Sequence, residues 1–225
     1  MIKFEGVTKK FPNGTPAVAS LSFEVSPGEF IFLVGPSGAG KTTILRLILH
    51  ELVPTTGQIF VGEHNLSKIT GGGVTQLRRK IGCVFQDLKL LDDRSVAENV
   101  ALSLFVLGKN EKEVEQDVAN KLVLVGLKDK GDFFPAQLAG GELQRVAIAR
   151  ALAGDPEYLL ADEPTGNIDD ANAWKIVKIL DKINKSGTTI IMATHNGEIV
   201  DTLGKRVIRL EDGHIISDKK GKYRE

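Results

Sequence analysis

Apolar and polar residues alternate through the first third of the chain before helical spacing takes over. Alternation with a period of two predicts strands at 2–9, 17–25 and 57–62, and the apolar run FIFLVG predicts another at 30–35. Apolar residues that recur every three or four positions predict a helix at 41–52. The first third of the chain is therefore expected to be mostly strand.

Helical spacing dominates the middle of the chain, which follows a buried strand at 81–85. The glycine run TGGGV at 70–74 is expected to be a flexible joint at most. Helices are predicted at 96–108, 111–126 and 141–153.

Strands return in the last third, at 157–162 and 188–194, with a helix at 173–184 between them. A hairpin is predicted at 205–218, turning at Asp212-Gly213. Strands with helical crossovers at both ends of the chain imply an α/β fold with a parallel sheet. The helical middle is then a subdomain inserted into that fold.

Composition and charge narrow the class of protein. Of 225 residues, 42% are hydrophobic and 26% are charged, which is typical of a globular chain that buries a core. Lys+Arg and Asp+Glu number 29 each, so net charge gives no reason to expect a nucleic-acid partner. The charged start lacks the apolar core of a signal peptide, and no apolar run approaches the ~18 residues of a membrane span. We expect a soluble protein that contacts a membrane only through a partner. The basic tail KKGKYR is expected to be solvated, with contact to lipid headgroups beside the partner as the alternative.

One segment matches the phosphate-loop pattern G-x-x-x-x-G-K-[ST] between a predicted strand and a predicted helix. It is GPSGAGKT at 35–42, whose glycines permit backbone conformations that side chains would block. Its N–H groups can point at phosphate oxygens, aided by the positive end of the following helix. Lys41 can reach the β- and γ-phosphates of a nucleotide, and Thr42 can offer a hydroxyl to Mg²⁺. The alternative, a glycine-rich connection without a ligand, is disfavoured by the complete motif in this context.

Polar residues also follow three apolar strands, at the sheet edge where open α/β folds bind ligands. Asp162 ends the strand YLLAD and suits Mg²⁺ coordination. The next residue, Glu163, can orient or deprotonate an attacking water. His195 follows the strand IIMAT and can contact a γ-phosphate, and Gln86 follows IGCVF, where its amide can bind Mg²⁺ or the water.

Together these motifs resemble the ATP-binding cassette (ABC) ATPases over almost the whole chain. LAGGELQRVAIARAL at 138–152 is similar to the family signature, usually LSGGQ, and YLLADEP at 158–164 to its Walker B strand. GNID at 166–169 is similar to its D-loop, Gln86 to its Q-loop glutamine and His195 to its switch histidine. The resemblance implies a P-loop NTPase nucleotide-binding domain with a RecA-like core, an N-terminal antiparallel β subdomain and an inserted α-helical subdomain. In a single domain at 1–225, the ATP-binding core with the β subdomain would comprise 1–86 and 157–225, and the helical subdomain 87–156.

The resemblance also implies a role for each site residue, with ATP and Mg²⁺ as the bound groups. The catalytic residues would be Glu163, His195 and Lys41. The metal ligands would be Thr42, Gln86 and Asp162. The residues that bind ATP within one chain would be Phe11, which would stack on adenine, with Gly35, Pro36, Ser37, Gly38, Ala39, Gly40, Lys41, Thr42, Thr43 and Gln86.

In this family two cassettes pack head to tail, and each signature covers the ATP held by the other subunit. This chain has one phosphate loop and one signature, so the resemblance implies a homodimer when ATP is bound. The residues acting on the partner's ATP would be Ala139, Gly140, Gly141 and Asp169.

Ala139 departs from the family, which usually has serine at this position. Alanine removes a hydroxyl donor, and one hydrogen bond to a charged group contributes about 1.5–3 kcal/mol. We therefore expect weakened dimer closure and slow hydrolysis. Glu142 replaces the usual glutamine, which is a smaller change.

Within the family, ADEPTGNID at 161–169 resembles a branch that includes cell-division, lipoprotein-release and macrolide-exporter ATPases. FQDLKLL at 85–91, GTTIIMATHNGEIVDTL at 187–203 and the ending DKKGKY are most similar to the cell-division group. That group implies an FtsX-like integral membrane partner, a location on the cytoplasmic face of the membrane, and control of peptidoglycan hydrolases.

Other functions remain open at this point. The nearest alternative is the ATPase of a lipoprotein-release or macrolide-type exporter, which the DLKLL segment disfavours. Soluble repair or translation ATPases fit a chain of 225 residues poorly. A non-enzymatic nucleotide-binding scaffold is disfavoured by the presence of Glu163 and His195, although Ala139 slightly favours it.

Overall fold

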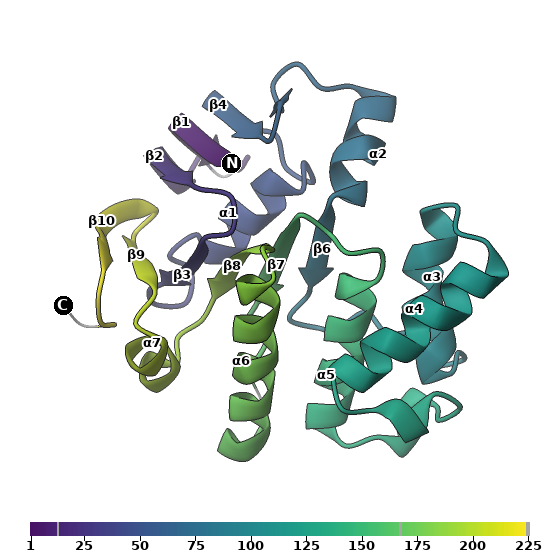
Figure 1. Ribbon diagram of the computed structural model, residues 1–225. Helices are drawn as coiled ribbons and strands as arrows, with labels where there is room; N and C mark the ends of the chain where they lie inside the picture. The colour runs from purple at the N-terminus through teal and green to yellow at the C-terminus, as the bar shows by residue number, and fades with distance from the viewer. Residues whose placement is uncertain (13, 167, 224–225) are drawn as a thin grey trace.

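The computed structural model describes residues 1–12, 14–166 and 168–223, which form two β-sheets and a set of helices (Figure 1). The strands are β1 (Ile2–Lys10), β2 (Pro16–Val25), β3 (Phe30–Val34), β4 (Thr56–Val61), β5 (His64–Asn65), β6 (Ile81–Val84), β7 (Tyr158–Asp162), β8 (Thr189–Ala193), β9 (Arg206–Glu211) and β10 (His214–Lys220). The α-helices are α1 (Lys41–Ile48), α2 (Gly71–Arg79), α3 (Val96–Val106), α4 (Glu111–Leu124), α5 (Gly140–Leu152), α6 (Asp170–Lys185) and α7 (Gly197–Leu203), and Lys128–Lys130 and Pro135–Gln137 form short 3₁₀ turns. No helix in the described part of the chain is long and apolar enough to cross a membrane.

The larger sheet has the strand order β10-β9-β3-β8-β7-β6. Its strands pair in parallel from β9 to β6, and only the β9–β10 hairpin is antiparallel. Side chains of β3 alternate between two apolar cores, with Phe32 packed on one face and Ile31 and Leu33 on the other. The predicted parallel sheet and C-terminal hairpin are confirmed.

The smaller sheet is antiparallel, with the order β2-β1-β4-β5. Helix α1 packs between the two sheets, because its buried Ile44, Leu47 and Ile48 join the core that β1, β2 and β4 line. This arrangement confirms the predicted N-terminal antiparallel β subdomain beside a RecA-like core. The packing of α1 also places its start beside the end of β3, to which residues 35–40 connect it.

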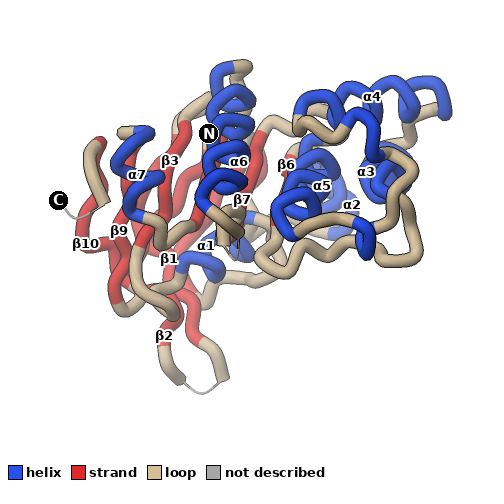
Figure 2. Tube along the Cα trace, turned by 90° about the horizontal axis from the view of Figure 1, so that it is seen from below, coloured by secondary structure: helices blue, strands red, loops and turns tan. Residues whose placement is uncertain are grey.

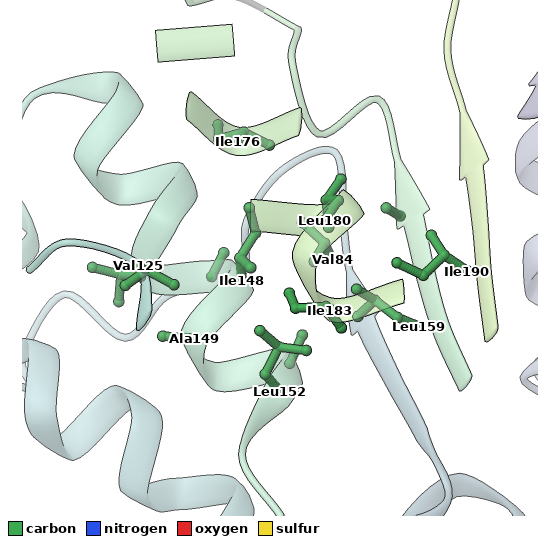
Figure 3. Close-up of a cluster of buried hydrophobic side chains, with 14 of the residues drawn as sticks. Val84, Val125, Ile148, Ala149, Leu152, Leu159, Ile176, Leu180, Ile183 and Ile190 are labelled. Atoms are coloured by element: carbon green, nitrogen blue, oxygen red, sulfur yellow. The ribbon is translucent and has the colours of Figure 1, made fainter. Parts of the chain in front are cut away.

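Helices α3, α4 and α5 gather beyond β6, at the end of the molecule away from β10 (Figures 1 and 2). Helix α6 joins this group to the large sheet. Its apolar side chains meet those of α5 and of the strands in one cluster, shown in Figure 3, whose labelled members include Ile148, Leu152, Ile176, Leu180, Ile183, Val84, Leu159 and Ile190. The predicted α-helical subdomain is confirmed, and its side chains pack in the same cluster as those of the large sheet.

One prediction from the sequence pattern is wrong, and one helix was not predicted. The glycine run at 70–74 is not a flexible joint, because α2 begins at Gly71 and buries Leu77 completely. In its last turn, Arg78 donates a hydrogen bond to the carbonyl oxygen of Leu49. Tertiary packing outweighs the low helix propensity of glycine here. Helix α7 was also missed, although its start has a capping signal, since the Asn196 side chain accepts a hydrogen bond from the amide of Ile199.

Candidate functional site

A cavity of about 650 Å³ opens where β3, β7 and β8 end. It is lined by residues 35–38 and 40–43 of the predicted phosphate loop, and by Gln86, Asp162, Glu163 and His195. The fold thus brings all six of the predicted catalytic and metal-binding residues into one cavity, from four separate parts of the chain.

The phosphate loop owes its shape to close backbone contacts. Gly40, with φ of 104°, caps α1, and a Cβ atom there would lie 2.6 Å from the carbonyl oxygen of Ala17. The Lys41 ammonium is buried and donates hydrogen bonds to the carbonyl oxygens of Gly35 (2.8 Å) and Pro36 (3.0 Å). The backbone of the loop therefore surrounds the Lys41 ammonium at the N-terminus of α1. This arrangement favours the binding of an anion.

Asp162 ends β7 with only 7% of its surface exposed. Burial raises the pKa of its carboxyl above the ordinary value, and a hydrogen bond with Thr42 opposes that rise. Among the described residues its Oδ1 atom has no hydrogen-bond partner. A buried carboxylate oxygen without a donor is costly, and an oxygen-ligated cation would relieve the cost. The side chains of Thr42, Asp162 and Gln86 offer the hard oxygen ligands that Mg²⁺ takes, so this part of the cavity fits that ion.

Glu163 has a left-handed backbone conformation with φ of 49°, which is uncommon for a residue with a side chain. Its amide donates to the carbonyl oxygen of Ala193 (3.0 Å), which ties it to the end of β8. Its Oε2 atom lies 3.0 Å from Nδ1 of His195, whose side chain is 70% exposed. A carboxylate and an imidazole from adjacent strand ends thus meet at the cavity.

Comparison with known proteins identifies the family. Residues 18–166, more than half of the chain, match the family described as "ABC transporter". The chain belongs to the ABC transporter family. Its relatives include the "Cell division ATP-binding protein FtsE" of Streptococcus pneumoniae serotype 2, which is 49% identical over 99% of this chain and 97% of that protein. The proteins of the same name from Bacillus subtilis (48% identical, 99% of this chain, 98% of that protein) and Escherichia coli (44%, 96% and 97%) are also similar.

Solved structures agree with this family. A dimeric bacterial ABC transporter cassette is 35% identical, with a TM-score of 0.90 over 98% of both chains. A dimeric ABC cassette in a post-hydrolysis state, bound to ADP and phosphate, is 34% identical, with a TM-score of 0.89 over 98% of both chains. The predictions of the ABC fold and of an ABC ATPase are confirmed.

Several residues expected to contact ATP lie outside the described lining of the cavity. Ala39 is 2% exposed and packs in the core between the two sheets. Phe11 is 38% exposed, and its ring lies 5.8 Å from the ammonium of Lys9. The four residues expected to act on a partner's ATP are also outside it. They are Ala139, Gly140, Gly141 and Asp169.

The ABC signature lies at the start of α5. Ala139 is the N-cap residue, and its amide donates to Oε2 of Glu142 (3.1 Å). Because alanine offers no side-chain acceptor in return, the amide of Glu142 bonds to the carbonyl oxygen of Ala139 (2.8 Å). Lys130 (2.6 Å away), followed by the Ala139 amide, lowers the pKa of Glu142. One half of a capping box is therefore present at this helix start.

The two signature glycines have different surroundings. Gly140 is exposed, with no atom within 4 Å of where a Cβ atom would stand. Gly141 is buried, and a Cβ atom there would lie 2.7 Å from Cγ of Asn172 on α6. Only Gly140 presents an open backbone, whereas Gly141 allows α5 and α6 to touch.

The D-loop is tied to the same contact. Asp169 caps α6, accepting from the amide (2.9 Å) and the side chain (2.6 Å) of Asn172, and these bonds lower the pKa of its carboxyl. Asn172 also accepts from Arg145 of α5 (3.1 Å). The predicted D-loop residue Asn167 lies outside the described residues.

The sequence interpretation missed Gly166 and Tyr223 as cavity residues. Gly166 follows Glu163 in a tight turn, its amide donating to the Glu163 carbonyl oxygen (3.0 Å). The Tyr223 amide donates to Oδ1 of Asp201 (2.6 Å), and its ring packs against Gly197 beside His195. The expectation of a solvated tail is therefore wrong for Tyr223. Its position depends on a contact with α7, which no local pattern encodes.

Proposed function

We propose that this chain is the ATP-hydrolysing subunit of an FtsE-type cell-division complex. It would bind MgATP at a homodimer interface and drive an FtsX-like integral membrane protein that regulates peptidoglycan hydrolysis. Three relatives named FtsE, each matched over at least 96% of this chain, carry the biological part of the proposal. The cavity that joins Lys41, Thr42, Asp162, Glu163 and His195 supports the chemical part.

Phosphate binding follows from the loop geometry. The N–H groups at the start of α1 and the ammonium of Lys41 converge on the cavity and bind the β- and γ-phosphates of ATP. Lys41 exchanges its bonds to the Gly35 and Pro36 carbonyl groups for bonds to phosphate oxygens. The stronger, charge-assisted bonds favour the exchange.

Thr42, Asp162 and Gln86 would hold Mg²⁺. When bound, the ion neutralises charge that develops on the phosphate oxygens. Glu163 then orients the attacking water and accepts its proton, since its carboxylate is only 14% exposed and aimed into the cavity by its left-handed backbone. His195, 3.0 Å from Glu163, keeps that carboxylate and the γ-phosphate in line.

Dimerisation completes the site. Gly140 and the N–H groups of the first turn of α5 lie outside the chain's own cavity, with no neighbour over Gly140. A second copy packed head to tail brings them to the γ-phosphate, with Asp169 beside them. The dimeric cassettes among the similar structures support this arrangement. We assign 1–86 and 157–225 to the ATP-binding core and 87–156 to the helical subdomain.

A second cavity, of about 510 Å³, suits a membrane partner. It lies between β6 and the helices α2, α3 and α5, and apolar groups such as Phe85, Leu102 and Leu107 form much of its wall. Val106 of α3, which lines this cavity, is 63% exposed, and the neighbouring Phe105 is 56% exposed. An exposed apolar rim around a groove is typical of a protein-binding surface. We assign it to a cytoplasmic helix of the FtsX-like protein, which holds the chain at the cytoplasmic face of the membrane.

The test uses Glu163→Gln, which keeps the shape of the side chain but removes the base. With MgATP this variant is expected to form a stable dimer by light scattering, whereas Lys41→Ala stays monomeric and binds no nucleotide. A Glu163→Gln protein that turned over ATP at the wild-type rate would remove Glu163 from its role.

The same Glu163→Gln protein then captures its partner from detergent-solubilised membranes of the source cell. A four-span protein with one large extracytoplasmic loop supports the cell-division role. Adding Val106→Glu should abolish capture without affecting the ATP-bound dimer. Capture of a larger permease or a lipoprotein-release subunit would leave the site assignments intact and replace the biological role with that of an exporter ATPase.

A further inference from the structure

The loop that follows Gln86 has an unusual backbone. Leu88 and Lys89 are consecutive non-glycine residues with φ of 51° and 52°. L-residues visit this left-handed region singly and at a cost, so two in succession need outside support. The nearby Asp87–Lys89 ion pair is exposed on both sides and contributes little.

The support comes from the far end of the signature helix. In the last turn of α5, the guanidinium of Arg150 donates from Nη1 to the carbonyl oxygen of Lys89 and from Nη2 to that of Leu88. Arg150 is itself fixed to α3, because its carbonyl oxygen accepts a hydrogen bond from Ser103 (3.2 Å). One planar fork thus bonds both strained residues, which an ammonium could not do with the same geometry.

Helix α5 therefore has a functional residue at each end. Ala139 caps its start, where the proposed dimer meets the partner's ATP, and Arg150 holds the loop beside Gln86 of the chain's own cavity. These positions are 11 residues apart, which corresponds to about 16 Å of helix at about 1.5 Å per residue. A helix of this length moves as a rigid body, so a displacement of its N-terminus also displaces Arg150.

We propose that Arg150 is a positioning residue that keeps the Leu88–Lys89 backbone left-handed and thereby holds Gln86 in the nucleotide cavity. Through α5 it couples the Gln86 position of one site to the signature that serves the other. This inference rests on the proposed ATPase mechanism and adds a residue to it.

The first measurement is hydrogen exchange of the segment 85–91 in nucleotide-free protein. Arg150→Ala should speed its exchange by about tenfold, which corresponds to about 1.4 kcal/mol of lost protection. Arg94→Ala is the matched control, because among the described residues that guanidinium pairs only with the exposed Glu98 in the same region. Unchanged exchange in Arg150→Ala would overturn the proposal whether or not the protein hydrolyses ATP.

The second measurement is steady-state ATP hydrolysis. Arg150→Ala should lower kcat about tenfold while KM for MgATP stays within about threefold, since the phosphate loop is untouched. Adding Lys89→Gly should return kcat to within about threefold of Lys89→Gly alone, because glycine adopts positive φ without support. Adding Lys89→Ala removes the same side chain but keeps Cβ, and should not rescue.

Equal rescue by alanine and glycine, or no rescue by glycine, would show that Arg150 acts by another route and overturn the proposal. If Arg150→Ala does not fold, Arg150→Lys tests the same point, with an intermediate loss of kcat and the same rescue by Lys89→Gly. Wild-type protein that hydrolyses no ATP would instead refute the proposed function, while the exchange measurement would still decide the role of Arg150.

Discussion

Replacing Ala139 by serine adds one hydroxyl at the N-cap of α5, where two separate effects are expected. The backbone at Ala139, with φ of −73° and ψ of 157°, already has the extended conformation of an N-cap. Glu142 already accepts from the Ala139 amide (3.1 Å), so serine would complete the capping box. The hydroxyl can accept from the helix and still donate its proton to a phosphate.

Two magnitudes follow from this geometry. Serine in place of alanine at an N-cap contributes about 1 kcal/mol. In a chain of this size that raises the unfolding temperature by about 2–4 °C. One hydrogen bond to a charged phosphate contributes about 1.5–3 kcal/mol, which is roughly 10- to 150-fold in dimer closure.

Ala139→Gly separates the two effects, because glycine is nearly as good an N-cap as serine but carries no hydroxyl. The unfolding temperature measured without nucleotide should rise for both variants. Dimerisation of the Glu163→Gln protein, titrated with MgATP, should tighten only with serine, and ATP turnover in the Glu163 background should follow it. If Ala139→Ser changed neither dimerisation nor turnover, the reasoning would be refuted. If glycine matched serine in both assays, the effect would be one of helix capping alone.

Three further predictions concern Asp162 and the two signature glycines. Asp162→Asn should raise the unfolding temperature at neutral pH while abolishing MgATP hydrolysis. Burial raises the folded-state pKa of Asp162, so the folded chain binds the proton more tightly than the unfolded chain, and stability falls as pH rises from near 4 through the raised value. Gly141→Ala should destabilise the fold by about 1–3 kcal/mol through overlap with Asn172, measured by denaturant unfolding. Gly140→Ala should leave stability unchanged or slightly higher but lower turnover roughly tenfold, since the added methyl group obstructs one phosphate contact.

Each of these predictions has an outcome that contradicts it. The gain from Asp162→Asn should vanish at low pH, where the wild-type carboxyl is protonated, and a gain independent of pH would point to a different cause. Equal loss of stability in Gly140→Ala and Gly141→Ala would contradict the different surroundings of the two glycines.

Much of the fold can be predicted from the sequence, because the pattern of apolar residues determines which segments are buried. Phe30–Val34 is apolar throughout and is buried throughout, so its identity as a central strand needs no tertiary information. The cavity follows from the same rule. Asp162 lies opposite Ala193 in the parallel register, so residues just beyond the two strands are neighbours whichever side chains they carry.

The remainder depends on contacts between distant segments. Gly71 begins a helix because Leu77 finds a complete core there, against the local preference of a glycine run. Tyr223 reaches the cavity through Asp201, and Arg150 reaches Leu88 across 62 positions of sequence. Periodicity reports the local preference for helix or strand, and motifs report the chemistry of single residues. Neither predicts contacts between residues that are distant in the sequence.

The contact between Gly141 and Asn172 bears on how the ABC signature is interpreted in other chains. Even alanine at position 172 would retain a Cβ atom, which lies 2.8 Å from where a Cβ of residue 141 would stand. Helix packing alone therefore keeps a glycine at 141, whether or not nucleotide is ever bound. A descendant that had lost ATP hydrolysis and survived as a scaffold would still inherit this glycine. Gly140, which has no such neighbour, would be free to drift, so it is the more informative of the two positions for telling a working enzyme from a pseudoenzyme.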